Sequence, residues 1–273
     1  MSGGVGADFP LRAAAGIVLG ILALGVAWSG GFLFLGFWLL AFSVVIFEWQ
    51  SLPGGEGLAL RVATGVLALI VAAPLALHNE RVFAIAVICG GAVLAGAVGR
   101  GRSGGVFWST AGVLYAGLPF LAVIFLRGSP AFGLRATLWL FAVVWGCDVF
   151  AYFGGRLLQG PKLWPAVSPG KTWSGFFAGV IGGAAAGVLA LGFAEPLRIF
   201  TLGLVAAAIA QGADLFESAI KRRFGVKDSG RIIPGHGGIM DRLDGFIGAA
   251  VFAAAYAATR AGGDWIASGL TSN

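Results

Sequence analysis

Residues 30–47 read GGFLFLGFWLLAFSVVIF, a run without a single charged side chain. Its length is close to the roughly 20 apolar residues with which one helix crosses a bilayer. Lipid cannot hydrogen-bond the backbone, and the run lacks the alternation of a barrel strand, so we expect a transmembrane helix.

Similar apolar runs recur along the whole chain of 273 residues, which is 58% hydrophobic and only 11% charged, with a mean hydropathy of +0.92. Soluble domains carry about 25% charged residues, so composition excludes an ordinary soluble protein. We predict an all-α, polytopic integral membrane protein with about nine transmembrane helices, within a range of eight to ten. The runs are residues 11–28, 30–47, 60–77, 82–99, 106–126, 132–153, 174–194, 199–220 and 245–259.

Basic residues divide unequally between the two sides of such a bundle. With nine spans, thirteen of the 18 lysines and arginines fall on the side of the N-terminus, which the positive-inside rule places in the cytoplasm. The net charge of +6 then reflects loop orientation and anionic lipid, and we expect no nucleic-acid partner. Segments 154–173 and 221–242 must share this face, because two spans separate them.

The two halves of the chain differ in their ionisable residues. Up to residue 127 the spans hold almost none, whereas Asp148, Asp214 and Glu217 lie at or within later helix ends, where charge is costly and marks function. We therefore predict a scaffold over 1–127 and a catalytic region over 128–273, in one continuous membrane domain.

Glycines 175, 179, 183 and 187 recur every four residues. This spacing strips one helix face bare and lets a neighbouring helix approach closely. We expect helix packing along this face, and a homodimer formed through small-residue faces.

The richest polar stretch is Asp214–Asp244, DLFESAIKRRFGVKDSGRIIPGHGGIMDRLD. At helical spacing, Asp214, Glu217, Ser218 and Lys221 point to one side. The following glycines break the helix and allow backbone amides to approach a ligand. A new helix is expected to open near Asp241. The last apolar run is short, so it either begins inside a membrane pocket or takes residues from this loop.

Carboxylates clustered with hydroxyls suit Mg²⁺, which takes a few carboxylate oxygens and completes its shell with water and phosphates. The neighbouring cations Lys221, Arg222, Lys227 and Arg242 suit a polyphosphate. Together they indicate phosphoryl or nucleotidyl transfer. The alternative is a solvated basic loop with helix-capping aspartates.

Three runs without gaps, Ser218–Arg222, Lys227–Gly230 and Ile233–Asp244, resemble the signature of the phosphatidate cytidylyltransferase (CDP-diglyceride synthetase) family. Trp145–Arg156 and Pro165–Trp173 also look like segments of that family, so the resemblance covers about residues 145–250. Two positions depart from it: Ser174 stands where members commonly have glutamate, and Ala213 where they commonly have glycine.

The resemblance implies a multi-pass enzyme of a bacterial-type inner (plasma) membrane, with its active site facing the cytoplasm. It would join CTP to phosphatidic acid, giving CDP-diacylglycerol and pyrophosphate. The cofactor would be Mg²⁺, either alone, as one of two divalent ions, or together with an additional monovalent cation. The expected catalytic residues are Asp214, Lys221, Asp241 and Asp244, and the expected metal ligands are Asp148, Asp214, Asp228, Asp241 and Asp244. The expected substrate-binding residues are Ser168, Lys171, Thr172, Ser218, Arg222, Lys227, His236, Gly237, Gly238 and Arg242.

Rival functions remain open at this point. A CTP-dependent polyprenol or phytol kinase would use similar cations, and only its product would separate it. A phosphatidyl-transfer enzyme of the CDP-alcohol type would need an Asp-Gly-x-x-Ala-Arg element, which is absent here. A cation-coupled transporter would need acidic residues near mid-membrane in both halves.

Overall fold

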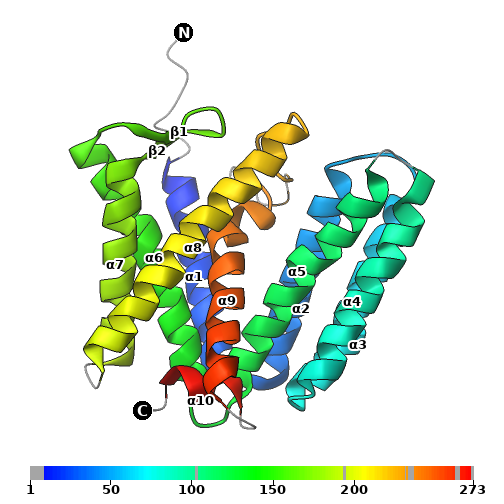
Figure 1. Cartoon of the computed structure of the whole chain (residues 1–273), viewed down its shortest axis with the longest axis horizontal. Helices are drawn as coiled ribbons and strands as arrows, with labels where there is room; N and C mark the ends of the chain where they lie inside the picture. Colours follow the sequence, from blue (N-terminus) through cyan, green and yellow to red (C-terminus); the bar gives the residue numbers. More distant parts are fainter. Residues whose placement is uncertain are drawn as a thin grey trace.

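The computed structural model of the chain describes residues 9–101, 104–192, 195–230, 232, 237–261 and 265–271, with side chains from residue 16 onward. Within these residues, long helices run back and forth between two ends of a bundle (Figure 1). The helices are α1 (Phe9–Ser29), α2 (Gly31–Ser51), α3 (Leu58–Leu77), α4 (Arg81–Val98), α5 (Gly105–Gly128), α6 (Gly133–Leu158), α7 (Trp173–Leu191), α8 (Pro196–Arg223), α9 (Met240–Arg260) and α10 (Ile266–Thr271). A 3-10 turn η1 (Gly99–Gly101) and the strands β1 (Lys162–Trp164) and β2 (Ser168–Thr172) complete the fold.

Each of the predicted apolar runs corresponds, apart from a few residues at its ends, to one long helix, α1 to α9 in chain order, which confirms the all-α membrane fold. In the described part of the chain, the seven helices α2 to α8 are long and apolar enough to cross a membrane. The exact count of nine is not confirmed, because α1 contributes a shorter apolar segment, Gly16–Ser29, and α9 begins with three charged residues in its first turns. Helix α9 starts at Met240, so the short last run does take residues from the preceding loop.

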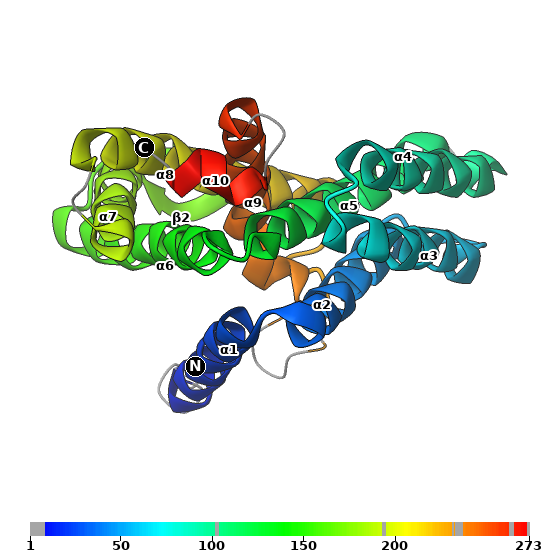
Figure 2. The same ribbon diagram turned by 90° about the horizontal axis from the view of Figure 1, so that it is seen from below.

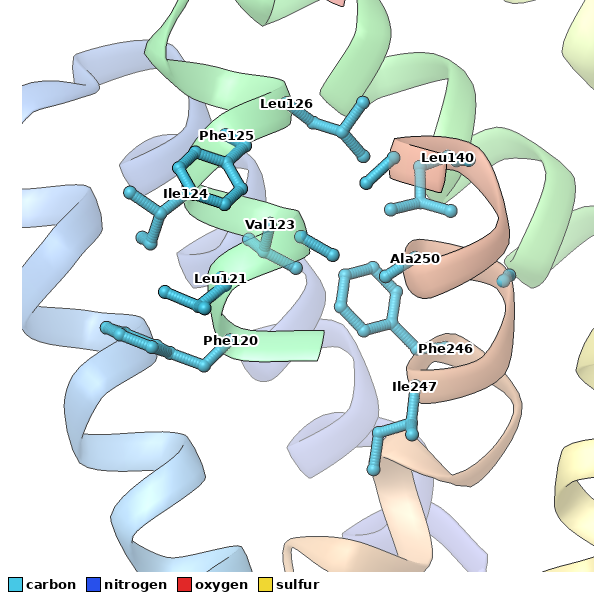
Figure 3. Packing of buried hydrophobic residues seen from close by; sticks show 14 of the residues in the cluster. Phe120, Leu121, Val123, Ile124, Phe125, Leu126, Leu140, Phe246, Ile247 and Ala250 are labelled. Atoms are coloured by element: carbon cyan, nitrogen blue, oxygen red, sulfur yellow. The ribbon is translucent and has the colours of Figure 1, made fainter. Parts of the chain in front are cut away.

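The helices form two neighbouring groups, α2 to α5 and α6 to α9, with contacts between α5 and α9 joining them (Figure 2). The core between the groups is built from the buried segment Phe120–Leu126 of α5, facing Leu140, Phe246 and Ala250 (Figure 3). Trp38 of α2 stacks on Phe246 of α9, with ring centroids 4.9 Å apart. Inside a membrane the hydrophobic effect does not drive helices together, because lipid tails and helix side chains are both apolar. Close side-chain packing of this kind holds them together instead.

The glycine face of α7 packs against α6 within the chain. A Cβ added at Gly183 would lie 2.7 Å from the Val143 carbonyl oxygen, and one at Gly187 would lie 2.7 Å from Val143 Cγ2. The prediction of close helix packing is confirmed. Because α6 covers this face, the face does not supply a contact for the predicted homodimer, which stays a prediction.

The described residues of the two polar segments, 154–173 and 221–242, lie at one end of the bundle, as expected (Figure 1). The first contains an antiparallel hairpin, β1–β2, in which Lys162 pairs with Thr172 and Trp164 with Ser168. The hairpin touches the end of α8, where Arg222 Nε donates to the Val167 carbonyl at 3.4 Å. This hairpin had no counterpart in the sequence prediction.

Candidate active site

A polar cavity of about 500 Å³ opens between α6, β2, α7 and α8. Two cations, Arg156 and Lys171, and the polar side chains Tyr152 and Gln211 line it. Arg156 Nη1 donates to the Tyr152 hydroxyl at 2.8 Å, which orients both side chains on the cavity wall. The two cations could donate charge-assisted hydrogen bonds to an anionic ligand, and the carboxylates Asp148 and Asp214 balance their charge in the same lining.

A second space, which we call the apolar groove, has a volume of about 570 Å³ and lies between α1, α2, α6 and α9. Its wall is mostly hydrocarbon and aromatic, including Leu19 and Ala23 of α1, Trp38 of α2 and Trp145 of α6. Helix α1 stands at the edge of the bundle and forms one side of the groove (Figure 2). Ile17, Ile21 and Leu24 on α1 are exposed, as lipid-facing residues would be.

Asp148 of α6 and Asp214 of α8 line both the polar cavity and the apolar groove. These two carboxylates therefore stand where the two spaces meet. Lys171 Nζ lies 2.5 Å from Asp214 Oδ2, and both side chains are partly exposed, at 21% and 30%. Ser218 Oγ, one turn along α8, lies 3.5 Å from Asp214 Oδ1.

A buried chain of polar contacts runs from α5 through α8 to α9. The Tyr115 hydroxyl donates to Glu217 Oε2 at 2.9 Å, and Lys221 Nζ donates to Glu217 Oε1 at 3.1 Å. Lys221 also donates to Asp241 Oδ1 at 2.7 Å. Glu217 is fully buried, so removing one partner would leave an uncompensated charge, at a cost of about 3–5 kcal/mol.

Asp241 also binds the loop before α9. Both of its oxygens accept from the Ser229 amide, at 3.1 and 3.0 Å, and Oδ2 accepts from the Gly238 amide at 2.8 Å. Gly237, with φ +82°, leaves room for this carboxylate, because a Cβ there would lie 2.5 Å from Asp241 Oδ2. A Cβ at Gly238 would instead overlap the Ser229 hydroxyl and the Glu48 carboxylate. Asp244, one turn further, faces the groove and accepts only from the neighbouring Gly245 amide, at 2.7 Å, among the described contacts.

Glu48 of α2 is a site residue that the sequence analysis missed. It is 1% exposed and accepts from the Ile239 and Met240 amides, at 3.0 and 2.8 Å, and from the Ser229 hydroxyl at 2.9 Å. Its position could have identified it, because it follows directly after the long apolar run 30–47. A charged side chain is costly at the end of a membrane span and often marks a functional site.

The two departures from the family pattern have local explanations. Thr172 Oγ1 accepts from the Gly175 amide at 3.1 Å and so caps α7. Ser174 lies beside it and donates to the Gln159 carbonyl, which ties α7 to the end of α6. Ala213 packs against Gly248 of α9, where an added Cβ would lie 2.7 Å from the alanine methyl group.

The predicted site residues that the structure describes thus fall into four sets. Asp148, Asp214, Lys171 and Thr172 line the polar cavity, and Asp148, Asp214, Asp241, Arg242 and Asp244 line the groove. Lys221 and Ser218 contact these carboxylates from α8. Ser168, Arg222, Lys227, Asp228, Gly237 and Gly238 are outside the lining of both spaces in the described part of the chain. His236 lies outside the described residues.

The donor chemistry at the meeting point fits a hard cation such as Mg²⁺. No three His, Cys, Asp or Glu side chains within the described residues stand close enough together to form a complete protein-only site. Mg²⁺ is usually held by one or two carboxylates together with substrate phosphates and water, so this arrangement suits an ion that arrives with a nucleotide. One or two of the carboxylates Asp148, Asp214 and Asp244, which line the groove, would hold it together with those phosphates.

Comparison with known proteins gives a consistent answer. A phosphatidate cytidylyltransferase of Brucella abortus is 39% identical over 248 residues, covering 86% of this chain and 87% of the relative. Enzymes of the same name from Rickettsia typhi (32% over 202 residues; 70% of this chain, 88% of the relative) and Staphylococcus haemolyticus (45% over 139 residues; 50% and 52%) also match. The profile of the cytidylyltransferase family matches residues 10–259. The chain therefore belongs to the cytidylyltransferase family and is a CTP-dependent nucleotidyltransferase.

Proposed function

We propose that this enzyme transfers the cytidylyl group of CTP to phosphatidic acid, giving CDP-diacylglycerol and pyrophosphate. The observation that carries the proposal is the position of Asp148 and Asp214, which line a polar cavity on one side and an apolar groove on the other. A reaction between a water-soluble nucleotide and a lipid needs such a meeting point. The names of the similar enzymes support the same substrates.

The polar cavity suits CTP. Lys171 and Arg156 would bind the triphosphate, since charge-assisted hydrogen bonds to phosphate are among the strong ones. The apolar groove suits phosphatidate, because its hydrocarbon wall matches acyl chains. Four carboxylates also line the groove, so the head-group phosphate would need both Arg242 and a bound cation to offset their charge. The two phosphates would then face each other across Asp148 and Asp214.

In the reaction, a phosphate oxygen of phosphatidate attacks the α-phosphorus of CTP. One P–O bond forms, the bond to the β-phosphate breaks, and pyrophosphate leaves. Because a phosphate is already a competent nucleophile, the chain needs no serine or histidine nucleophile, and its work is positioning and charge neutralisation. Bound Mg²⁺ supplies charge neutralisation at the phosphates. Lys171 stabilises the phosphates on the polar side, while Lys221 holds Asp241 and hence the first turn of α9.

The active site faces the cytoplasm of a bacterial-type inner membrane in this proposal. The support is the sequence count of basic residues: with nine spans, thirteen of the 18 are expected on the face that carries segments 154–173 and 221–242. CTP is made in the cytoplasm, so this orientation also gives the polar cavity access to its substrate.

The test is an assay of the purified protein with Mg²⁺ and CTP labelled at either the α- or the γ-phosphate. With phosphatidate we expect the α-label in the lipid product and the γ-label in pyrophosphate. A lipid kinase would instead place the γ-label in the lipid and would accept polyprenol in place of phosphatidate. Transfer of the γ-label to any lipid, or preference for polyprenol, would reject the proposal.

Asp244→Asn supplies the matched inactive variant for this assay. The amide keeps the shape of the carboxylate but loses the charge proposed to bind the cation, so turnover should disappear while the protein stays folded. Retained turnover would remove Asp244 from the metal site.

A further inference from the structure

The N-terminus of α9 lacks a capping side chain of its own. The residue at the cap position is Ile239, which carries no acceptor, although the first amides of a helix need partners from outside it. These partners come from Glu48, which accepts from Ile239 and Met240. The cap of α9 is therefore supplied by α2, from a position about 190 residues away in the chain.

The same carboxylate also holds the other end of the α8–α9 connection. Glu48 Oε2 accepts from the Ser229 hydroxyl at 2.9 Å. A Cβ at Gly230 would lie 2.7 Å from Glu48 Oε1, and one at Gly238 would overlap both of its oxygens, so the backbone closes tightly around it. Glu48 thus binds both Ser229 and the first residues of α9 to one position on α2.

Glu48 lies outside the lining of the polar cavity and the apolar groove, within the described part of the chain. Its contacts lead instead to Asp241 and Asp244, which face the groove from the first turns of α9. Any movement of Ile239 and Met240 would carry these two carboxylates with it. A misplacement of about 1 Å in a reacting arrangement can cost a factor of about 100 in rate.

We propose that Glu48 is a positioning residue for the nucleotidyl transfer: it caps α9 from α2 and so fixes where Asp241 and Asp244 stand relative to the substrates. The inference rests on the proposed function for its kinetic part. Its structural part, the protection of the Ile239 and Met240 amides, stands independently of any activity.

The experiment compares Glu48→Ala and Glu48→Gln with the wild-type protein in detergent, with kcat referred to folded protein. We expect kcat of Glu48→Ala to fall about 100-fold, with the KM values for CTP and phosphatidate changing less than about threefold. Glu48→Gln keeps the shape and one acceptor oxygen, so it should recover about tenfold of this loss. Hydrogen exchange at the Ile239 and Met240 amides should accelerate at least about tenfold in Glu48→Ala.

Gln50→Ala is the matched control. Gln50 is also buried near the end of α2, but its side chain donates to the Ser109 carbonyl at 2.9 Å, on the side of α5. This variant should lower stability while leaving kcat and the exchange of Ile239 and Met240 within about twofold of wild type. An equal loss of kcat in Gln50→Ala and Glu48→Ala would overturn the proposal, as would a wild-type kcat in Glu48→Ala.

If Glu48→Ala does not fold, Glu48→Gln and Ser229→Ala decide the question. Ser229→Ala removes only the hydroxyl contact and should lower kcat about threefold with faster exchange at Met240. Wild-type kcat and wild-type exchange in both variants would overturn the proposal. Inactivity of the wild-type protein with phosphatidate would instead reject the proposed function, while exchange would still test the cap.

Discussion

The polar cavity and the apolar groove are of similar size but are built from different parts of the chain. The cavity is made by α6, α7, α8 and strand β2, all after residue 133, and it presents Lys171 and Arg156. The groove takes two of its walls from α1 and α2, and its lining there is glycine, leucine and aromatic side chains. The first half of the chain is therefore more than a support, because it shapes one of the two spaces.

The difference between the two spaces teaches where selectivity should reside. Substitutions in the polar cavity should change the kinetic constants for the nucleotide, and substitutions in the groove should change those for the lipid. Changes at Asp148 or Asp214 should affect the reaction with both substrates. The following predictions separate these three cases, from the largest effect to the smallest.

Removal of divalent cations should stop turnover at the meeting point while leaving the bundle folded. Lys171 already pairs with Asp214, and Lys221 with Asp241 and Glu217, so the carboxylates keep partners without a metal. We expect loss of activity in EDTA, recovery with Mg²⁺, and a Tm change of less than about 3 °C, about the shift that 1 kcal/mol produces in a chain of this size. Unfolding on chelation would show that the metal is structural.

Asp214→Asn should lower kcat about 1,000-fold, because it removes one of the two carboxylates that both substrates meet. The loss should be the same whichever substrate is varied. Glu56→Gln, an exposed carboxylate outside both spaces, is the control for the change in charge. A loss confined to the KM of one substrate would mean that Asp214 belongs to one space alone.

Lys171→Met should weaken the binding of CTP and leave the binding of phosphatidate nearly unchanged. A hydrogen bond to a charged group contributes about 1.5–3 kcal/mol, so the KM for CTP should rise about tenfold or more. The KM for phosphatidate should stay within about twofold. Initial rates with each substrate varied in turn measure both values, and equal increases would contradict the assignment of the polar cavity to CTP.

Gly20→Leu should have the smallest effect, limited to the lipid. Gly20 lines the groove, and a Cβ there would lie 3.9 Å from Trp145, so alanine fits but leucine fills space meant for acyl chains. We expect the KM for long-chain phosphatidate to rise severalfold, with short-chain substrate less affected, since each buried CH₂ contributes about 0.8 kcal/mol. Gly25→Leu is the control on the same helix, because Gly25 has open space around it.

The fold was largely predictable because the bilayer fixes how long an apolar run must be. The nine runs match nine helices, and the glycine spacing in α7 correctly indicated a close neighbour. The β1–β2 hairpin was not predicted, because its strands are three and five residues long and their pairing is irregular. Strands this short carry no readable alternation.

The site could be predicted from the sequence only where its residues lie close together in one segment of the chain. The spacing of Asp214, Glu217, Ser218 and Lys221 predicted the polar face of α8. The contacts between Ser218 and Asp214 and between Lys221 and Glu217 agree with it. Glu48 escaped notice because its partners are mainly backbone amides, which have no signature in a sequence. The role of Asp241 as a metal ligand stays a prediction, since its oxygens already accept from Lys221, Ser229 and Gly238.

Under the proposed function, the ion pair between Lys171 and Asp214 must open when the nucleotide binds in the polar cavity, and each side chain then takes a new ionic partner. An incoming triphosphate would compete with Asp214 for the ammonium group. A cation bound to the nucleotide would compensate the aspartate that loses this partner. Free nucleotide without its cation would leave Asp214 facing another anion, so the enzyme should distinguish the complexed nucleotide from the bare one at the first contact.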